Sequence, residues 1–306
     1  MSNVDMTIRI GNLTLNNPVL VSSGTFGYGR EFADFIDLNK LGGIITKAIT
    51  PKPRAGNPPP RIIETPAGVL NAIGLENCGL DAFIKDKLPY LKDLSAAIVV
   101  NVAGACESDY VEVVSSLSKE DGVDAFEINI SCPNVKQGGI EFGTDAGRAG
   151  ELVEKLRAAT KLPLIIKLSP NVADVCEIAA GAEAAGADAF SLVNTYRGMA
   201  IDIAKERPVL GNKIGGLSGP AIKPLSLYQV WKLYQSTKLP IIGMGGIMNH
   251  IDAIEFIYAG ASAVSVGTAN FIDPSASVKI VDGLSTWLAE KSPRGFEYFI
   301  GRAHRA

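Results

Sequence analysis

The chain has 306 residues, of which 47% are hydrophobic and 20% are charged, and it contains 32 glycines. This composition supports a large buried core and argues against intrinsic disorder. The formal net charge of −3 and the lack of any basic run argue against a non-specific nucleic-acid binder, so we expect a small molecule or a protein as partner.

Several further classes of protein are disfavoured by what the sequence lacks. No uncharged run of about 18 apolar residues occurs, and the first residues show no basic segment followed by an apolar one. We therefore expect a cytoplasmic protein without a membrane segment. No CxxC pair occurs among the four cysteines, and only two histidines are present. We expect neither a disulfide framework nor a bound metal.

The chain begins with a predicted β-hairpin. In TIRIGNLTLNNP, apolar and polar residues alternate on both sides of Gly11 and Asn12, which is typical of two short strands joined by a tight turn. We expect this hairpin to cover the amino-terminal end of the sheet that follows it.

Eight apolar, β-branched segments of strand length follow, at residues 18–24, 42–50, 96–104, 125–132, 162–170, 189–195, 239–247 and 263–270. Their near-continuous hydrophobicity indicates burial on both faces, as in a parallel sheet covered by helices. Helix-like segments lie between them, for example at residues 80–94, 146–160, 172–186, 223–237 and 250–260. Eight alternating units predict a (β/α)8 TIM barrel, which we expect to span residues 1–306 as a single domain.

The predicted loops are unequal in length. Links from helix to strand are short, whereas three links from strand to helix are long, at about residues 50–79, 131–147 and 196–222. In a (β/α)8 barrel these longer links all lie on the face that carries active sites. The proline-rich start of the first link excludes a helix, and residues 61–77 are expected to form a small hairpin over the barrel mouth.

Polar residues recur where the predicted strands end. Each alone is explained as a solvated charge or a turn former, but all of them converge on one mouth. They are Ser22, Ser23, Thr46, Lys47, Asn101, Asn129, Cys132, Lys167, Asn194, Thr195 and the pairs Gly245-Gly246 and Gly267-Thr268. Amide, hydroxyl and ammonium groups of this kind can hold a planar polar ring.

The two glycine-containing pairs predict a phosphate site. They follow the seventh and eighth strands, where phosphate binds in many barrels of this type. Glycine allows backbone N–H groups to approach phosphate oxygens without a Cβ between them. No GxGxxG follows a strand, so a nicotinamide dinucleotide is not indicated, and a mononucleotide such as FMN is the natural alternative.

At this point the sequence resembles a known family. The segments SSGTFGYG, GGIITKAIT, GNPPPRIIETPAGVLNAIGLEN, EINISCPNVKQGG, IKLSPN, LVNTYRGMAID, IGGLSGPAIKP, GMGGI and VGTAN resemble the dihydroorotate dehydrogenases in order along nearly the whole chain. The resemblance is strongest to the catalytic FMN subunit of class 1B. It implies oxidation of dihydroorotate to orotate in pyrimidine biosynthesis, within one FMN-binding barrel.

The resemblance also implies roles for individual residues. Cys132 would be the catalytic base that removes the ring proton. FMN would be bound by Ser23, Thr46, Lys47, Asn101, Asn129, Lys167, Val193, Gly219, Gly245, Gly246, Gly267 and Thr268. The substrate would be contacted by Lys47, Asn71, Ala72, Ile73, Gly74, Leu75, Asn129, Asn194 and Thr195.

Class 1B enzymes pass electrons to a separate iron–sulfur flavoprotein that carries FAD and a [2Fe-2S] cluster and reacts with NAD. The resemblance therefore implies such a partner, in a heterotetramer built on a homodimer of this chain. Three alternatives remain open: a class 1A-type enzyme that reduces fumarate, a related dihydropyrimidine-oxidising flavoenzyme, and a non-flavin barrel that binds a phosphorylated metabolite.

Overall fold

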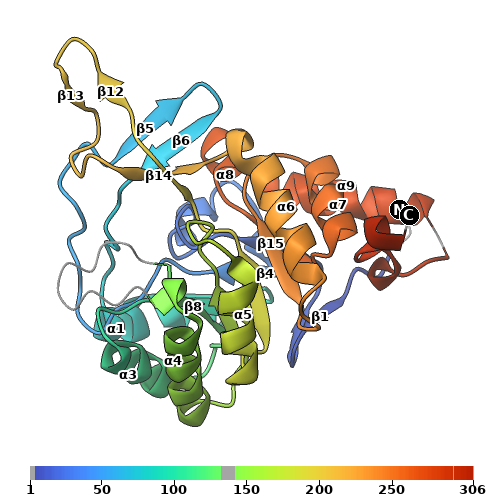
Figure 1. Cartoon of the computed structure of the whole chain (residues 1–306). Helices are drawn as coiled ribbons and strands as arrows, with labels where there is room; N and C mark the ends of the chain where they lie inside the picture. The colour runs from blue at the N-terminus through green and yellow to red at the C-terminus, as the bar shows by residue number, and fades with distance from the viewer. Residues whose placement is uncertain (1–3, 132–141, 292, 306) are drawn as a thin grey trace.

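The computed structural model describes residues 4–131, 142–291 and 293–305. Eight parallel strands close into a barrel (Figure 1), and each of them falls within one of the eight segments predicted from the sequence. In barrel order they are β3 (Val19–Val21), β4 (Gly43–Ile45), β7 (Ala97–Val102), β8 (Ala125–Asn129), β9 (Leu164–Lys167), β10 (Ala189–Leu192), β15 (Ile241–Met244) and β16 (Ala263–Val266). The (β/α)8 prediction is confirmed.

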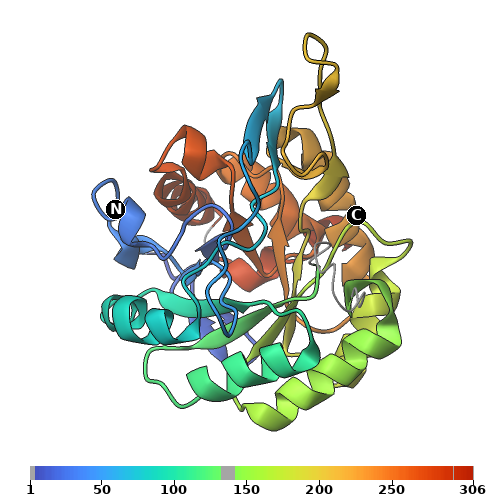
Figure 2. The ribbon, with the colours of Figure 1, turned by 90° about the vertical axis from the view of Figure 1, so that its left-hand side faces the viewer.

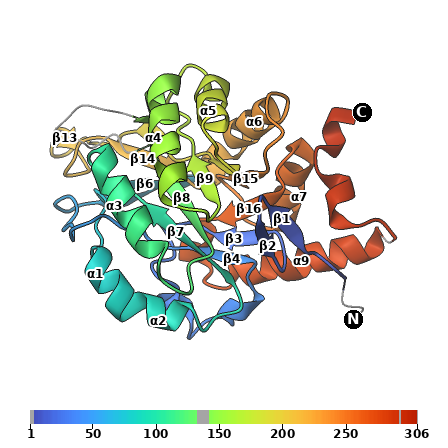
Figure 3. The same ribbon diagram turned by 90° about the horizontal axis from the view of Figure 1, so that it is seen from below.

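The predicted amino-terminal hairpin is present and lies at the amino-terminal end of the barrel strands. It consists of β1 (Ile8–Ile10) and β2 (Leu13–Leu15), which pair in antiparallel register around Gly11. A Cβ at Gly11 would lie 3.2 Å from Cβ of Asp188, the residue that precedes β10. The hairpin therefore packs beneath the amino-terminal ends of the strands, as Figure 3 shows from below.

Helices cover the outside of the barrel. They are α3 (Glu107–Leu117), α4 (Ala146–Ala159), α5 (Val175–Ala184), α6 (Lys223–Tyr234), α7 (His250–Ala259), α8 (Ala269–Ile272) and α9 (Ala276–Glu290). The single helix expected over residues 80–94 is divided into α1 (Leu80–Ala82), a π-helical turn (Phe83–Lys87) and α2 (Leu88–Leu91). Pro89 lies in the first turn of α2 and has no N–H to donate, which prevents regular α-helical hydrogen bonding there.

Two of the long strand-to-helix links combine into a second small sheet. The first contributes β5 (Ile62–Thr65) and β6 (Gly68–Asn71), which form the predicted hairpin. The link at about residues 196–222 contributes β11 (Tyr196–Gly198) and β14 (Gly215–Ser218). It also carries the short strands β12 (Ile201–Asp202) and β13 (Arg207–Pro208). The strand order in this sheet is β11-β14-β6-β5. The hairpin of β5 and β6 and the hairpin of β12 and β13 project beyond the barrel (Figure 2). The long link at about residues 131–147 falls largely outside the described residues.

Short 3₁₀ turns complete the described secondary structure. They lie at Arg30–Phe32, Leu38–Lys40, Phe142–Thr144, Pro220–Ile222, Phe296–Phe299 and Arg302–Arg305. Over the described ranges, none of the helices is both long and apolar enough to cross a membrane.

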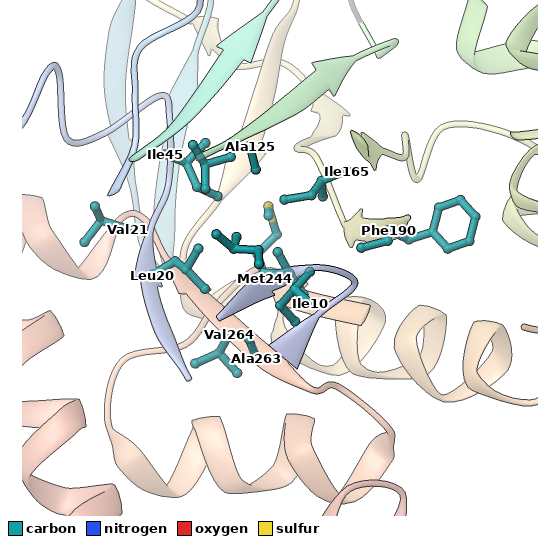
Figure 4. Close-up of a cluster of buried hydrophobic side chains, with 14 of the residues drawn as sticks. Ile10, Leu20, Val21, Ile45, Ala125, Ile165, Phe190, Met244, Ala263 and Val264 are labelled. Carbon is teal, nitrogen blue, oxygen red and sulfur yellow. The ribbon is translucent and has the colours of Figure 1, made fainter. Parts of the chain in front are cut away.

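The hairpin at the barrel floor should contribute directly to stability. Ile10 is fully buried and belongs to the apolar cluster that fills the barrel, together with Leu20, Ile165 and Val264 (Figure 4). We expect Ile10→Ala to lower the free energy of unfolding by about 2–5 kcal/mol, because it removes buried methyl groups and leaves a cavity.

Denaturant unfolding followed by circular dichroism measures this change. Arg9→Ala is the control, since Arg9 lies on the same strand but faces solvent. It should change the free energy of unfolding by less than about 0.5 kcal/mol. If Ile10→Ala and Arg9→Ala changed the free energy of unfolding equally, the buried face of the hairpin would not contribute to stability as expected.

Candidate active site

A cavity of about 580 Å³ lies between the carboxyl ends of the barrel strands and the four-stranded sheet. Its size is within the range of cavities that bind cofactors and metabolites. Three cationic residues line it (Lys47, Lys167 and Arg197), against one carboxylate (Glu76), counted over the described part of the chain. This charge balance favours an anionic ligand.

Most of the residues predicted from the sequence line this one cavity, although they come from distant parts of the chain. Those expected at the cofactor are Ser23, Lys47, Asn101, Asn129, Lys167, Val193, Gly219, Gly245, Gly246, Gly267 and Thr268. Those expected at the substrate are Lys47, Asn71, Ala72, Ile73, Gly74, Leu75, Asn129, Asn194 and Thr195.

The two remaining predicted residues are Thr46, which does not line the cavity, and Cys132. Thr46 is fully buried behind the cavity wall, and its Oγ1 donates a hydrogen bond to the carbonyl of Lys47 at 3.1 Å. Its side chain therefore positions the strand end that carries Lys47. Cys132 lies outside the described residues. The residue before it, Ser131, lines the cavity and donates from its Oγ to the carbonyl of Lys167 at 3.0 Å.

The floor of the cavity is a buried polar cluster. Lys167 is only 5% exposed, and its Nζ lies 3.1 Å from Oε1 of Glu127 and 3.3 Å from Oγ of Ser23. Asn101 Nδ2 donates to the same Glu127 oxygen at 2.5 Å, and Ser191 Oγ donates to Oε2 at 2.8 Å. The cation at this floor is therefore held directly by Glu127 of β8 and by Ser23, which follows β3. Glu127 is held in turn by Asn101 and Ser191.

A second cation lies near the mouth. Nζ of Lys47 is 3.4 Å from Oε2 of Glu76, and Arg61 Nη1 approaches the same oxygen at 3.3 Å. Glu76 follows the hairpin of β5 and β6. We call this hairpin the flap, and the four-stranded sheet to which it belongs the flap sheet. The ion pair therefore joins the flap to the end of β4. An anionic ligand that contacts Lys47 would compete with Glu76 for the ammonium group.

The expected phosphate turn has the backbone that glycine permits. Gly245 and Gly246 adopt φ values of 116° and 81°, in the left-handed region. A Cβ on Gly246 would also lie 2.7 Å from the backbone nitrogen of Lys223. On the other side of the site, Thr268 donates from Oγ1 to Oγ of Ser218 at 2.9 Å, which links the eighth strand end to the flap sheet.

Lys223 lies beside this turn, where its ammonium group is paired with two carboxylates. Its Nζ lies 2.7 Å from Oδ1 of Asp252 and 3.0 Å from Oε2 of Glu255. The hydrogen bond that Lys223 donates to Asp252 raises the pKa of Lys223, which favours its charged form.

Amide side chains shape the wall beside the flap. Asn171 donates from Nδ2 to the carbonyl of Thr195 at 2.9 Å and accepts at Oδ1 from the backbone N–H of Arg197 at 2.9 Å. Asn71 donates to the carbonyl of Gly216 at 3.2 Å, which ties β6 to β14. These bonds set the wall through contacts between segments far apart in sequence.

The cavity suits a flavin mononucleotide. Oδ1 of Asn101 is buried and has no hydrogen-bond partner in the described part of the chain, and the N–H of a bound ring is a group that would satisfy it. Lys167 supplies a cation at the same floor, and the Gly245-Gly246 turn offers backbone N–H groups without a Cβ in the way. A polar ring and a phosphate together match these groups.

Sequence reasoning did not single out Glu127, Glu76 or Asn171. The signal for Glu127 was one carboxylate inside the otherwise apolar AFEINI strand, which is unusual for a buried barrel strand. Asn171 follows the polar end of the fifth strand directly, and Glu76 lies in the same stretch as the predicted substrate residues. Over the described residues, no group of three or more His, Cys, Asp or Glu side chains is placed so that it could hold a metal ion.

Comparison with known proteins identifies the family. The model of the family described as dihydroorotate dehydrogenase matches residues 5–288. The dihydroorotate dehydrogenase B (NAD(+)) catalytic subunit of Geotalea uraniireducens is 54% identical over 301 residues, covering 98% of this chain and 99% of that protein. The protein of the same name from Bacteroides thetaiotaomicron is 50% identical over 297 residues, covering 97% of this chain and 98% of that protein.

A solved structure agrees with these sequence matches. The crystal structure of DHODH from Eimeria tenella in complex with ferulenol superposes with a TM-score of 0.81 at 25% identity, covering 99% of this chain and 89% of that one. The family match thus extends over the barrel, the flap sheet and the cavity between them. The chain belongs to the dihydroorotate dehydrogenase family.

Proposed function

We propose that this chain is the catalytic subunit of an NAD-linked dihydroorotate dehydrogenase and that it oxidises dihydroorotate to orotate in pyrimidine biosynthesis. The observation that carries the proposal is the polar cavity floor. There, Lys167 and the unpaired Oδ1 of Asn101 meet the wall formed by Asn71, Asn194 and Thr195. We infer a cytoplasmic location and one FMN-binding barrel domain for the whole chain.

FMN is the cofactor that we propose for the cavity. It would accept the hydride that dihydroorotate loses. The residues that would hold it are Ser23, Lys47, Asn101, Asn129, Lys167, Val193, Gly219, Gly245, Gly246, Gly267 and Thr268, with Thr46 acting from behind. The positive charge of Lys167 would stabilise negative charge that develops on a ring bound above it.

The substrate site would lie next to the cofactor, under the flap. Lys47 would pair with the substrate carboxylate, and the amides of Asn71, Asn129 and Asn194 would hydrogen-bond the ring. Since each amide offers both a donor and an acceptor, a ring with a different pattern of N–H and C=O groups leaves buried groups unpaired. An unpaired buried group costs about 1–3 kcal/mol, which provides selectivity.

We assign the proton abstraction to Cys132. Its neighbour Ser131 lines the cavity and is bonded to the end of β9, so the loop starts at the cavity wall. A free thiol has a pKa of about 8.5, so a small thiolate fraction exists at neutral pH without a histidine partner. The proton leaves the ring carbon for the sulfur while the hydride leaves the adjacent carbon.

Electron transfer to NAD requires a partner in this proposal. The sequence has no dinucleotide fingerprint, and the described residues hold no cysteine cluster for an iron–sulfur centre. We therefore propose that an iron–sulfur flavoprotein with FAD and a [2Fe-2S] cluster binds a homodimer of this chain, which makes a heterotetramer.

The assignment of Cys132 makes a direct prediction. Cys132→Ala should keep bound FMN but slow its reduction by dihydroorotate by roughly 10² to 10⁴-fold, because the ring proton loses its acceptor. Stopped-flow measurement of the flavin absorbance after mixing with dihydroorotate gives this rate.

The matched control is Cys106→Ala, because Cys106 is exposed at the start of α3 and does not line the cavity. Its reduction rate should equal that of the unmodified protein. Rapid flavin reduction in Cys132→Ala would remove the base assignment, and a purified protein without any flavin absorbance would refute the proposed cofactor.

The electron acceptor distinguishes the proposed enzyme from a fumarate-reducing one. With dihydroorotate as donor, we expect NAD reduction only when the iron–sulfur flavoprotein is added, and no turnover with fumarate in either case. Steady-state assays with each acceptor, with and without the added flavoprotein, measure this difference. Turnover with fumarate by the chain alone would favour the class 1A alternative.

The pairing of Lys47 with Glu76 also has a measurable effect. Glu76→Gln should lower the KM for dihydroorotate roughly two- to fivefold, because the substrate carboxylate no longer competes with a partly exposed ion pair. The control is Glu64→Gln on the same hairpin, since Glu64 faces solvent and does not line the cavity. An unchanged or increased KM in Glu76→Gln, measured by initial rates, would contradict this competition.

A further inference from the structure

A buried carboxylate, that of Glu127, lies beneath the cavity. Glu127 lies in the middle of β8 and has no exposed surface, and among the described residues no other aspartate or glutamate is buried completely. Removing a charge from water is costly unless partners replace the lost solvation. Three side chains provide them: Asn101 at 2.5 Å, Ser191 at 2.8 Å and Lys167 at 3.1 Å.

The barrel itself creates this arrangement. The parallel register places Asn101 beside Glu127 across β7 and β8, and Lys167 beside Ser191 across β9 and β10. Four neighbouring strands thus contribute one polar layer within an otherwise aliphatic interior. Asn101 and Lys167 line the cavity, whereas Glu127 and Ser191 lie below it. The carboxylate cannot contact a ligand in the cavity and acts only through its neighbours.

The carboxylate determines which end of the Asn101 amide the cavity presents. An ionised carboxylate only accepts hydrogen bonds, so Asn101 must direct its NH₂ group toward Glu127. The opposite end, Oδ1, is buried without a partner in the described residues. Because Asn101 lines the cavity, a ligand N–H that reaches this oxygen would satisfy it.

The carboxylate also limits the positive charge of Lys167. One N–H of the ammonium group is directed to Glu127 and a second to Ser23, which leaves one for the cavity. Stability alone does not explain such a pair, because buried ion pairs add little compared with apolar residues of similar volume.

We propose that Glu127 is a positioning residue that sets both the hydrogen-bond polarity and the net charge of the cavity floor. It orients Asn101 as an acceptor and offsets the charge of Lys167 beneath the bound ring. The inference rests on the proposed function, because it concerns how this chain binds and tunes FMN.

Glu127→Gln tests the inference, since it keeps the size of the side chain and removes its charge. With the offsetting charge lost, the midpoint potential of bound FMN should shift to a more positive value. A glutamine can donate as well as accept, so the Asn101 amide is no longer held in one orientation, and FMN affinity should fall about tenfold. Redox titration and fluorescence titration of the ligand-free protein with FMN measure the two quantities.

Two further variants separate the electrostatic effect from a loss of structure. In Glu127→Gln/Lys167→Met both charges are absent, and its potential should lie between those of Glu127→Gln and Lys167→Met. Glu183→Gln is the matched control: its carboxylate accepts from Oγ1 of Thr237 at 2.7 Å on the outer helix α5, away from the cavity. It should leave potential and affinity unchanged.

The possible results separate a wrong role for Glu127 from a wrong proposed function. A Glu127→Gln protein with unchanged potential and FMN affinity would overturn the inference while leaving the proposed function intact. A native chain that does not bind FMN would refute the proposed function and the inference with it. If thermal unfolding shows that Glu127→Gln does not fold, Glu127→Asp replaces it. Glu127→Asp keeps the charge but shortens the reach, so FMN affinity should fall with little change in potential, and unchanged affinity would overturn the inference.

Discussion

The pairing of the last barrel strand with the first is the constraint on which the rest of the structure depends. β16 and β3 pair in parallel with Val264 opposite Val19, which closes the sheet and leaves no edge strand. Closure brings the carboxyl ends of all eight strands to one mouth. Residues as distant in sequence as Ser23 and Lys167 therefore come within 3.3 Å of each other.

The polar layer under the mouth departs from the usual aliphatic filling of such a barrel. Below it, side chains such as Leu20 and Ile165 pack as in any folded core. At the level of Glu127, the four neighbouring strands β7, β8, β9 and β10 instead carry an ion pair, an amide and a hydroxyl. This layer is costly unless every member is hydrogen-bonded, and its one unsatisfied atom among the described residues is the buried Oδ1 of Asn101, a residue that lines the cavity.

The flap shows how much of the site depends on contacts between loops. The hairpin of β5 and β6 was expected from its own sequence, but its pairing with β14 was not. The hydrogen bond from Asn71 to Gly216 and the ion pair between Lys47 and Glu76 join segments that local patterns cannot relate. Loop pairing is decided by the geometry of the barrel mouth, and no periodicity in either loop encodes it.

By itself the sequence determined the eight strands, the amino-terminal hairpin and the polar strand ends at the cavity, because hydrophobic periodicity and strand-end polarity are local signals. The resemblance to the family supplied Val193, Gly219 and residues 71–75. Only the tertiary structure decided that Thr46 lies behind the wall, that Glu76 pairs with Lys47, and that Glu127 holds Asn101 and Lys167. Those roles depend on which side chains meet across neighbouring strands and loops. Register and closure place them within hydrogen-bonding distance, and neither can be inferred from the composition of a single segment.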